Sequence, residues 1–207
     1  MLGLSGCHRS GKSTLAREYA KRNDILFVET SVSEVFRQLG LDPRKTYEVD
    51  HRLMIQEAVL ATLTRQYKEA SKKSRLFIAD RTPIDMASYM LADVTGSASQ
   101  GEAMAMLIND YVRRCLEVTM ENFAVVVLVQ PGIPIVDAPG KAAPCSAYME
   151  HLNMIQRGLM ADERFECQRF VIPRKTTDLQ KRLGSLDSAF SAAYEAAEAI
   201  KKSAQLH

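Results

Sequence analysis

The chain has 207 residues, of which 46% are hydrophobic and 25% charged, and its formal net charge is +2 at pH 7. This composition is that of a globular protein with enough length for one sizeable core, so we expect a single domain over residues 1–207. The near-neutral charge excludes a broad basic surface for nucleic acid but not a local basic groove, and no apolar run is long enough to cross a membrane.

The first predicted elements are a short apolar strand, a glycine-containing loop and a helix, in that order. The loop fits the phosphate-binding pattern G-x-x-x-x-G-K-[ST] at its four fixed positions, Gly6, Gly11, Lys12 and Ser13. Glycines let the backbone amides wrap around phosphates, Lys12 can reach the β- and γ-phosphates, and the Ser13 hydroxyl can ligate Mg²⁺. An incidental glycine turn is the alternative, and the strand and helix on either side argue against it.

The loop therefore predicts ATP as the bound cofactor, together with Mg²⁺. We expect these residues to contact the nucleotide: Gly6, Cys7, His8, Arg9, Ser10, Gly11, Lys12, Ser13 and Thr14. Cys7 and His8 occupy variable positions of the pattern, and we expect no chemistry from their side chains.

Apolar strands alternate with longer helical stretches along the rest of the chain. This alternation predicts an α/β fold, the three-layer α/β/α P-loop NTPase fold, with a mostly parallel sheet of about five strands. The predicted strands cover residues 2–5, 25–28, 75–79, 124–129 and 169–172. The predicted helices cover residues 12–21, 33–39, 48–72, 83–91, 102–121, 146–160 and 177 to about 200.

Two irregular segments interrupt this alternation. Residues 93–101 are rich in Gly, Ser and Ala, and residues 130–145 contain Pro131, Pro134, Pro139 and Pro144. Loops that leave the carboxyl ends of parallel strands are where ligands bind in open α/β sheets. We therefore expect a lid at about residues 130–150.

A carboxylate and a guanidinium follow the buried-strand pattern at residues 76–79. Asp80 and Arg81 lie at the predicted carboxyl edge of the sheet, as the phosphate loop does. The aspartate can hold the Mg²⁺ hydration shell together with Ser13, and the arginine can clamp phosphate oxygens. The alternative is structural, with Asp80 capping the next helix and Arg81 pairing with a surface carboxylate.

Four cysteines, Cys7, Cys115, Cys145 and Cys167, are scattered without a C-x-x-C spacing or a nearby histidine pair. This pattern predicts free thiols in a reducing compartment and no zinc site. The chain opens directly on the strand of the phosphate loop, which leaves no room for a signal peptide. We expect a soluble, cytoplasmic protein.

The loop at residues 6–14 and the pair Asp80-Arg81 resemble those of P-loop kinases of nucleosides and nucleotides. The nearest resemblance is to a phage and bacterial AAA-type ATPase or kinase branch, which includes ribosylnicotinamide kinase domains and phage DNA-modification kinases. It spans residues 2 to about 183. It implies transfer of the γ-phosphate of ATP, with Lys12, Asp80 and Arg81 as catalytic residues, in the host cytoplasm if the chain is phage-encoded.

The same resemblance implies residues for the acceptor. Glu29 matches the strand-end glutamate that accepts the proton of the attacking hydroxyl, and an exposed strand-end or helix-capping glutamate is the alternative. Arg52 and Gln56, one helical turn apart, border the acceptor pocket of relatives, and with Arg81 and Glu29 they form the predicted substrate site. A solvated helix face is the alternative for both.

The predicted lid departs from the resemblance, because relatives often place arginines over the phosphates. Residues 131–145 hold one cation, Lys141, followed by Arg157 and Arg164. Any of these three cations can stabilise the transferring phosphoryl group when the lid closes, whereas a solvated helix face also explains Arg157. The pair Arg113-Arg114 fits surface charge.

The function that follows is an ATP- and Mg²⁺-dependent kinase of a small nucleoside or nucleotide acceptor, acting as a monomer or homodimer. One alternative acceptor is DNA, in a phage kinase that phosphorylates 5-hydroxymethyluracil after unstacking the base. An alternative of another class is a regulatory or motor NTPase, which needs a water-positioning residue or a trans arginine that the sequence does not reveal.

Overall fold

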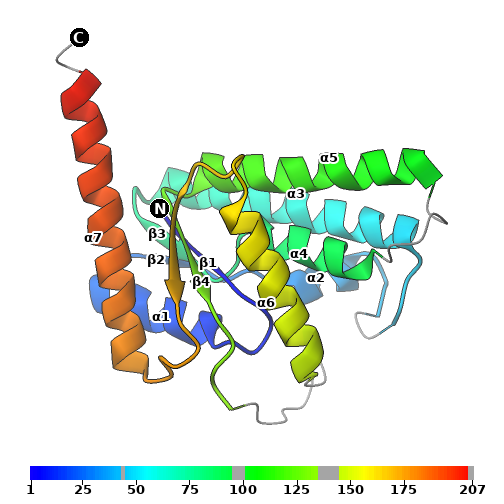
Figure 1. Ribbon diagram of the computed structural model, residues 1–207, viewed down its shortest axis with the longest axis horizontal. Helices are drawn as coiled ribbons and strands as arrows, with labels where there is room; N and C mark the ends of the chain where they lie inside the picture. The colour runs from blue at the N-terminus through cyan, green and yellow to red at the C-terminus, as the bar shows by residue number, and fades with distance from the viewer. Residues whose placement is uncertain (43–44, 95–100, 135–144, 205–207) are drawn as a thin grey trace.

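The computed structural model describes residues 1–42, 45–94, 101–134 and 145–204, and a five-stranded sheet forms its centre (Figure 1). The strands are β1 (Leu2–Ser5), β2 (Leu26–Val28), β3 (Phe77–Ala79), β4 (Val125–Val129) and β5 (Gln168–Ile172). Their order across the sheet is β2-β3-β1-β4-β5, and every neighbouring pair is parallel. The predicted α/β sheet is therefore confirmed, and all five carboxyl ends meet at one edge.

Each predicted helix is present, and its ends lie within five residues of the predicted ones. The helices are α1 (Lys12–Asn23), α2 (Val32–Gln38), α3 (Val49–Lys73), α4 (Pro83–Asp93), α5 (Gly101–Asn122), α6 (Ser146–Ala161) and α7 (Leu179–Ala204). The side chain of Asp178 accepts a hydrogen bond from the backbone N–H of Lys181 at 2.9 Å, and so caps the start of α7.

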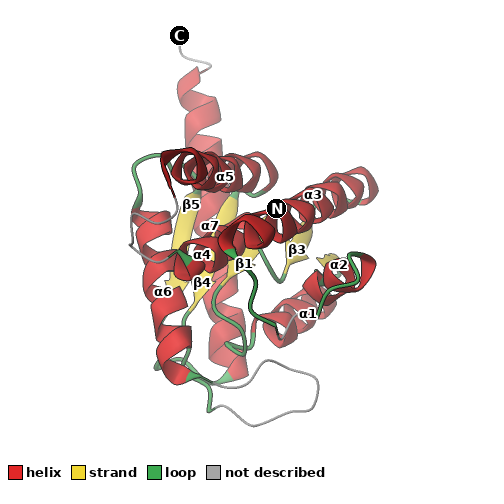
Figure 2. Cartoon of the chain, turned by 90° about the vertical axis from the view of Figure 1, so that its right-hand side faces the viewer, coloured by secondary structure: helices red, strands yellow, loops and turns green. Residues whose placement is uncertain are grey.

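The side chains of β4 show how the layers form, because they alternate between two apolar cores. Val125, Val127 and Val129 pack with residues of α1 and α7 on one face. Val126 and Leu128 pack with residues of α2, α3, α4 and α5 on the other, where the end of α6 also contributes. Both faces of the sheet are therefore covered (Figure 2), which explains why this strand is apolar throughout.

The chain direction places the polar ends of several elements together. Because the strands are parallel, the loops after β1, β3, β4 and β5 all leave from the same edge, and the helices return on the faces. We therefore expect the functional residues at this carboxyl edge.

Within the described ranges, no helix is long and apolar enough to cross a membrane.

Candidate active site at the phosphate loop

The phosphate loop has a backbone that only glycine fits at its two ends. Gly11 has φ 87°, and a Cβ there would lie 2.8 Å from Ile133 Cδ1 and 3.1 Å from Arg182 Nη1. A Cβ on Gly6 would lie 2.5 Å from the backbone oxygen of Val129. Arg9 also adopts a left-handed backbone, with φ 60°, which costs about 1 kcal/mol in a residue with a side chain. Gly6 and Gly11 therefore allow a tightly wound loop, of the kind whose backbone amides can bind phosphates.

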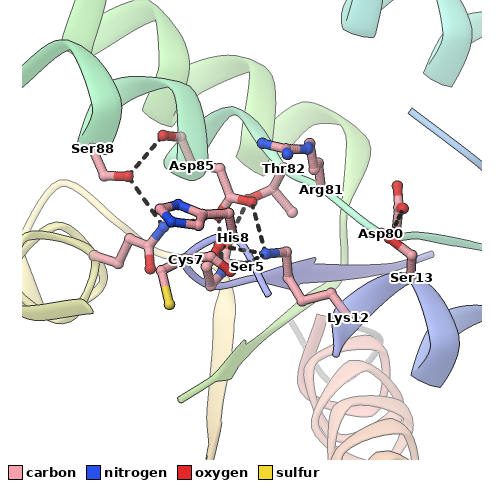
Figure 3. A network of polar contacts seen from close by, with 12 residues as sticks. Ser5, Cys7, His8, Lys12, Ser13, Asp80, Arg81, Thr82, Asp85 and Ser88 are labelled. Atoms are coloured by element: carbon pink, nitrogen blue, oxygen red, sulfur yellow. Dashed lines mark hydrogen bonds and ion pairs between the residues drawn. The ribbon is translucent and has the colours of Figure 1, made fainter. Parts of the chain in front are cut away.

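Lys12 is buried inside this loop, with its side chain only 6% exposed. Its Nζ donates hydrogen bonds to the backbone oxygens of Gly6 at 2.5 Å and Cys7 at 2.8 Å. It also lies 3.8 Å from the carboxylate oxygen Oδ2 of Asp85 (Figure 3). Burial lowers the pKa of Lys12, and the charge of Asp85 opposes this shift.

Asp85 is a site residue that the sequence analysis missed. It is fully buried, and its Oδ1 accepts hydrogen bonds from the backbone N–H of Gly6 at 2.9 Å and from Gln156 Nε2 at 3.2 Å. Burial raises the pKa of this carboxyl, and the positive charge of Lys12 opposes the shift. Asp85 therefore holds the first amide of the phosphate loop and faces its lysine.

Asp80 and Ser13, the two predicted metal ligands, are brought together. Ser13 Oγ donates a hydrogen bond to Asp80 Oδ2 at 2.5 Å. The other carboxylate oxygen accepts from the backbone N–H of Thr30 at 3.0 Å and from its hydroxyl at 2.8 Å. Asp80 is not the cap of α4, because the residue at that position is Thr82. The capping alternative for Asp80 is therefore wrong.

Oxygen ligands of this kind suit Mg²⁺, which prefers one or two carboxylates plus phosphates and waters. The hydroxyl of Ser13 and the carboxylate of Asp80 converge on one point at the start of α1, so the donor set fits the ion. Among the described residues there is no cluster of three or more His, Cys, Asp or Glu side chains that could hold a metal without a phosphate.

Arg81 points inward from the start of the β3–α4 connection. Its guanidinium carbon lies 6.0 Å from the ring centroid of Tyr89, and Asp80 and Asp85 are close enough to act on its charge. Its backbone oxygen accepts a hydrogen bond from Tyr67 Oη at 2.9 Å. The guanidinium of Arg81 therefore lies beside the polar network of Figure 3, next to Tyr89, and none of the ion pairs of the described residues includes it.

Glu29 lies at the end of β2, as predicted, but its carboxylate is turned outward. It is 63% exposed and pairs with Arg17 of α1 at 2.9 Å. The structure does not bring it into the network of Lys12 and Asp80. Its role as a general base stays a prediction.

Arg52 and Gln56 of α3 are withdrawn from solvent, so the solvated-face alternative does not hold for them. Arg52 Nε lies 2.7 Å from Asp93 Oδ2, at the end of α4, with exposed fractions of 20% and 25%. Gln56 is buried, and its side-chain oxygen has no hydrogen-bond partner among the described residues. A bound water or a ligand that donates a hydrogen bond would satisfy this acceptor, and the role of Gln56 in the substrate site stays a prediction.

The structure describes one of the two cations assigned to the lid. Lys141 lies outside the described residues. Arg157 is exposed near the end of α6. It follows Gln156, whose amide donates a hydrogen bond to Asp85 Oδ1, so this part of α6 lies beside the phosphate loop, and the role of Arg157 in the transfer stays a prediction. Arg164 pairs with Asp162.

His8 was expected to be inert, and it contacts two tyrosines. Its Nδ1 lies 3.3 Å from Tyr89 Oη, and its ring centroid is 6.0 Å from that of Tyr148. Burial lowers the pKa of His8, and the charge of Lys12 adds to this shift. The phosphate loop therefore touches α4 and α6 through this side chain.

The cysteines are free thiols, as predicted, and they differ in access. Burial raises the pKa of Cys7 to about 11, that of Cys115 to about 12 and that of Cys167 to about 11. Cys145 is exposed. At pH 8, about one in a thousand of the Cys7 thiols is ionised, and the thiolate is the reactive form.

We therefore expect Cys145 to react first with a disulfide reagent at pH 8, in a fast phase equal to one thiol per chain. The other three should react in the native protein only at a much slower rate. Absorbance of the released thiolate measures this. Cys145→Ser should remove the fast phase, and a fast phase that persists in this variant would contradict the burial of the others.

Removing the carboxylate of Asp85 should destabilise the fold. Asp85→Ala leaves the N–H of Gly6 and the amide of Gln156 without their acceptor, so we expect the free energy of unfolding to fall by about 3 kcal/mol. Asp85→Asn keeps one acceptor oxygen and should recover about half of the loss. Urea denaturation measures both. Exposed Asp187→Ala is the control, and equal losses in the two Asp85 variants would contradict the assigned hydrogen bonds.

The sheet order and the phosphate loop define the class of the protein, an α/β protein of the P-loop NTPase type. Residues 2–138, more than half of the chain, match the family described as AAA domain, and the chain belongs to that family. No curated protein matches the sequence.

Solved structures of deoxyadenosine kinase from M. mycoides share this fold. The form with bound dCTP aligns with a TM-score of 0.61 at 16% identity, covering 92% of this chain and 98% of the kinase. The form with the products dCMP and dCDP aligns with the same TM-score and coverage at 20% identity. The form with dATP gives 0.60 at 19% identity. Identities this low show a shared fold and leave the substrate open.

Proposed function

We propose that the chain is a kinase that transfers the γ-phosphate of Mg-ATP to a nucleoside or a nucleotide. The observation that carries the proposal is the contact of Ser13 with Asp80 at 2.5 Å, at the mouth of a loop that buries Lys12. A phosphate-binding loop alone is common to many NTP-binding proteins. A hydroxyl and a carboxylate that converge beside it add a place for the metal that phosphoryl transfer needs.

The donor side of the proposed site consists of the loop and the first turn of α1. Its backbone amides, with the helix N-terminus behind them, attract phosphate oxygens. The ammonium of Lys12 has three donors, of which two are used on the backbone oxygens of Gly6 and Cys7. Lys12 is therefore already positioned inside the loop, where the β- and γ-phosphates are expected.

Mg²⁺, when bound, would neutralise charge on the phosphates. Ser13 and Asp80 would hold it. Thr30 orients Asp80 through two hydrogen bonds to one oxygen, which leaves the other oxygen directed at Ser13. The carboxylate therefore needs no reorientation to serve as a ligand.

In the transfer step, an acceptor oxygen attacks the γ-phosphorus and the bond from that phosphorus to the β–γ bridging oxygen breaks, which releases ADP. Arg81 lies beside Asp80 and can neutralise charge on the transferred group. If the acceptor is an alcohol, its proton must leave, and Glu29 is the candidate that takes it. For this, the side chain of Glu29 must leave its exposed ion pair with Arg17 and turn toward the acceptor. A phosphate acceptor needs no strong base.

The acceptor side is proposed at α3 and α4, next to Arg81. The pair Arg52–Asp93 and the unsatisfied oxygen of Gln56 offer donors and acceptors that are withdrawn from solvent. A base edge is recognised by such groups, because each mismatched partner leaves a buried polar atom unpaired. Deoxyadenosine kinase from M. mycoides has this fold, so the fold permits an acceptor of the nucleoside class.

The experiment is ADP release from Mg-ATP with a panel of acceptors: deoxynucleosides, deoxynucleoside monophosphates, nicotinamide riboside, DNA with and without 5-hydroxymethyluracil, and water alone. We expect stimulation by one free nucleoside or nucleotide. Stimulation by the modified DNA alone would favour the DNA kinase instead. Hydrolysis that no acceptor alters would overturn the proposal in favour of a regulatory or motor NTPase.

A further inference from the structure

Arg182, in the first turn of α7, is a buried guanidinium that the proposed reaction does not use. Its side chain is 1% exposed and heads the set of the largest fully buried side chains. Its Nη1 donates a hydrogen bond to the backbone oxygen of Ser10 at 2.8 Å, and its Nε donates to the backbone oxygen of Thr176 at 2.6 Å. Nη2 has no partner among the described residues.

This placement is costly, because a guanidinium remains charged in proteins and a buried charge normally has a carboxylate beside it. The ion pairs found in the described part of the chain do not include Arg182. Burial lowers its pKa, and no acidic group in the described ranges raises it again. A leucine at this position of an apolar helix face would avoid that cost. Arg182 therefore provides two hydrogen bonds and a positive charge that a leucine would lack.

The hydrogen bonds join two loops that are far apart in the sequence. Ser10 belongs to the phosphate loop after β1, and Thr176 belongs to the loop after β5, residues 173–178. The loop after β4 completes the contact, since a Cβ on Gly132 would lie 1.9 Å from the backbone oxygen of Arg174. Figure 1 shows the start of α7 at the same end of the molecule as the start of α1. Arg182 lies where these three loops meet.

The sheet order indicates which half of a donor nucleotide these loops face. Asp80 and Arg81 follow β3, on one side of β1, and they mark the end of the phosphate chain where transfer occurs. The loop at residues 173–178 follows β5, on the other side of β1 beyond β4. A nucleotide whose γ-phosphate points toward β3 therefore directs its sugar and base toward residues 173–178.

We propose that Arg182 is a positioning residue that fixes loop 173–178 against the phosphate loop, so that this loop supports the sugar and base of the donor nucleotide. The proposal rests on the proposed function only in requiring that the phosphate loop binds a nucleoside triphosphate. It predicts that loss of Arg182 weakens the binding of a donor that has a base and leaves the binding of a donor without a base unchanged.

The test compares ATP with inorganic tripolyphosphate, each titrated with Mg²⁺ into the protein by calorimetry. The variants are Arg182→Met and Arg182→Lys, whose ammonium cannot span both backbone oxygens. We expect both variants to bind ATP about tenfold more weakly, and tripolyphosphate within about twofold of the wild type. Arg22→Met is the matched control, because Arg22 also joins α1 to α7, through exposed Asp187. It should change neither affinity.

Equal weakening of ATP and tripolyphosphate would overturn the proposal, because Arg182 would then act on the phosphates or on the loop itself. Unchanged affinities would overturn it as well. Circular dichroism shows whether each variant is folded, and if Arg182→Met is not, Arg182→Lys decides. A wild type that binds neither titrant would overturn the proposed function too, whereas ATP binding without transfer to any acceptor would overturn only the kinase.

Discussion

Replacing Lys12 by methionine should abolish phosphoryl transfer while the protein stays folded. The ammonium is buried inside the loop, and removal of a preorganised donor of this kind costs a rate factor of about 10² to 10³. Methionine keeps the volume of the buried stem. Asp85, which loses its facing charge, can take up a proton because burial already raises its pKa. The rate of acceptor phosphorylation measures the loss.

Lys21→Met is the matched control for this change. Lys21 lies on the same helix and is exposed, and its replacement by methionine removes the same charge from the chain. Its rate should equal that of the wild type, and both variants should give the far-ultraviolet circular dichroism of the wild type. Normal turnover in Lys12→Met would contradict the assignment of the loop as the donor site.

Asp80→Asn should lower the rate by about 10² and raise the Mg²⁺ concentration needed for half-maximal activity. The carboxamide can still accept the hydrogen bonds from Thr30, so the connection between β2 and β3 is retained. The charge that attracts the metal is lost. Rates measured over a series of Mg²⁺ concentrations separate a weaker metal site from a slower step.

Asp187→Asn serves as the control for Asp80→Asn, since Asp187 is an exposed partner of Arg22. Its activity and Mg²⁺ dependence should match those of the wild type. A purely structural role of Asp80 predicts a different result, in which the melting temperature falls and both rate and Mg²⁺ dependence stay normal. That outcome would remove Asp80 from the site.

The strands, the helices and the phosphate loop could be predicted from the sequence because their signals are local. Alternating apolar runs and helical stretches specify a parallel sheet, and the spacing of Gly6, Gly11, Lys12 and Ser13 specifies the loop. The pair Ser13 and Asp80 followed from topology, since both lie at the carboxyl edge. The structure places them in contact.

Asp85 and Arg182 could not be predicted, because their partners lie far away in the sequence. Asp85 contacts Gly6, 79 residues earlier, and an acidic residue in the first turn of a helix is ordinary. Arg182 contacts Ser10, 172 residues earlier, and looks like a surface cation in a helix that begins with Leu-Gln-Lys-Arg. The lid cations Lys141 and Arg157 stay predictions, since Lys141 lies outside the described residues and Arg157 is exposed on α6.

The most direct test of the account is to follow the γ-phosphate of labelled Mg-ATP in the presence of the acceptor that best stimulates ADP release. We expect the label on that nucleoside or nucleotide, in an amount equal to the ADP formed, and none with Lys12→Met. Recovery of the label only as inorganic phosphate, at the same rate with and without acceptor, would contradict the kinase and identify the chain as an NTPase.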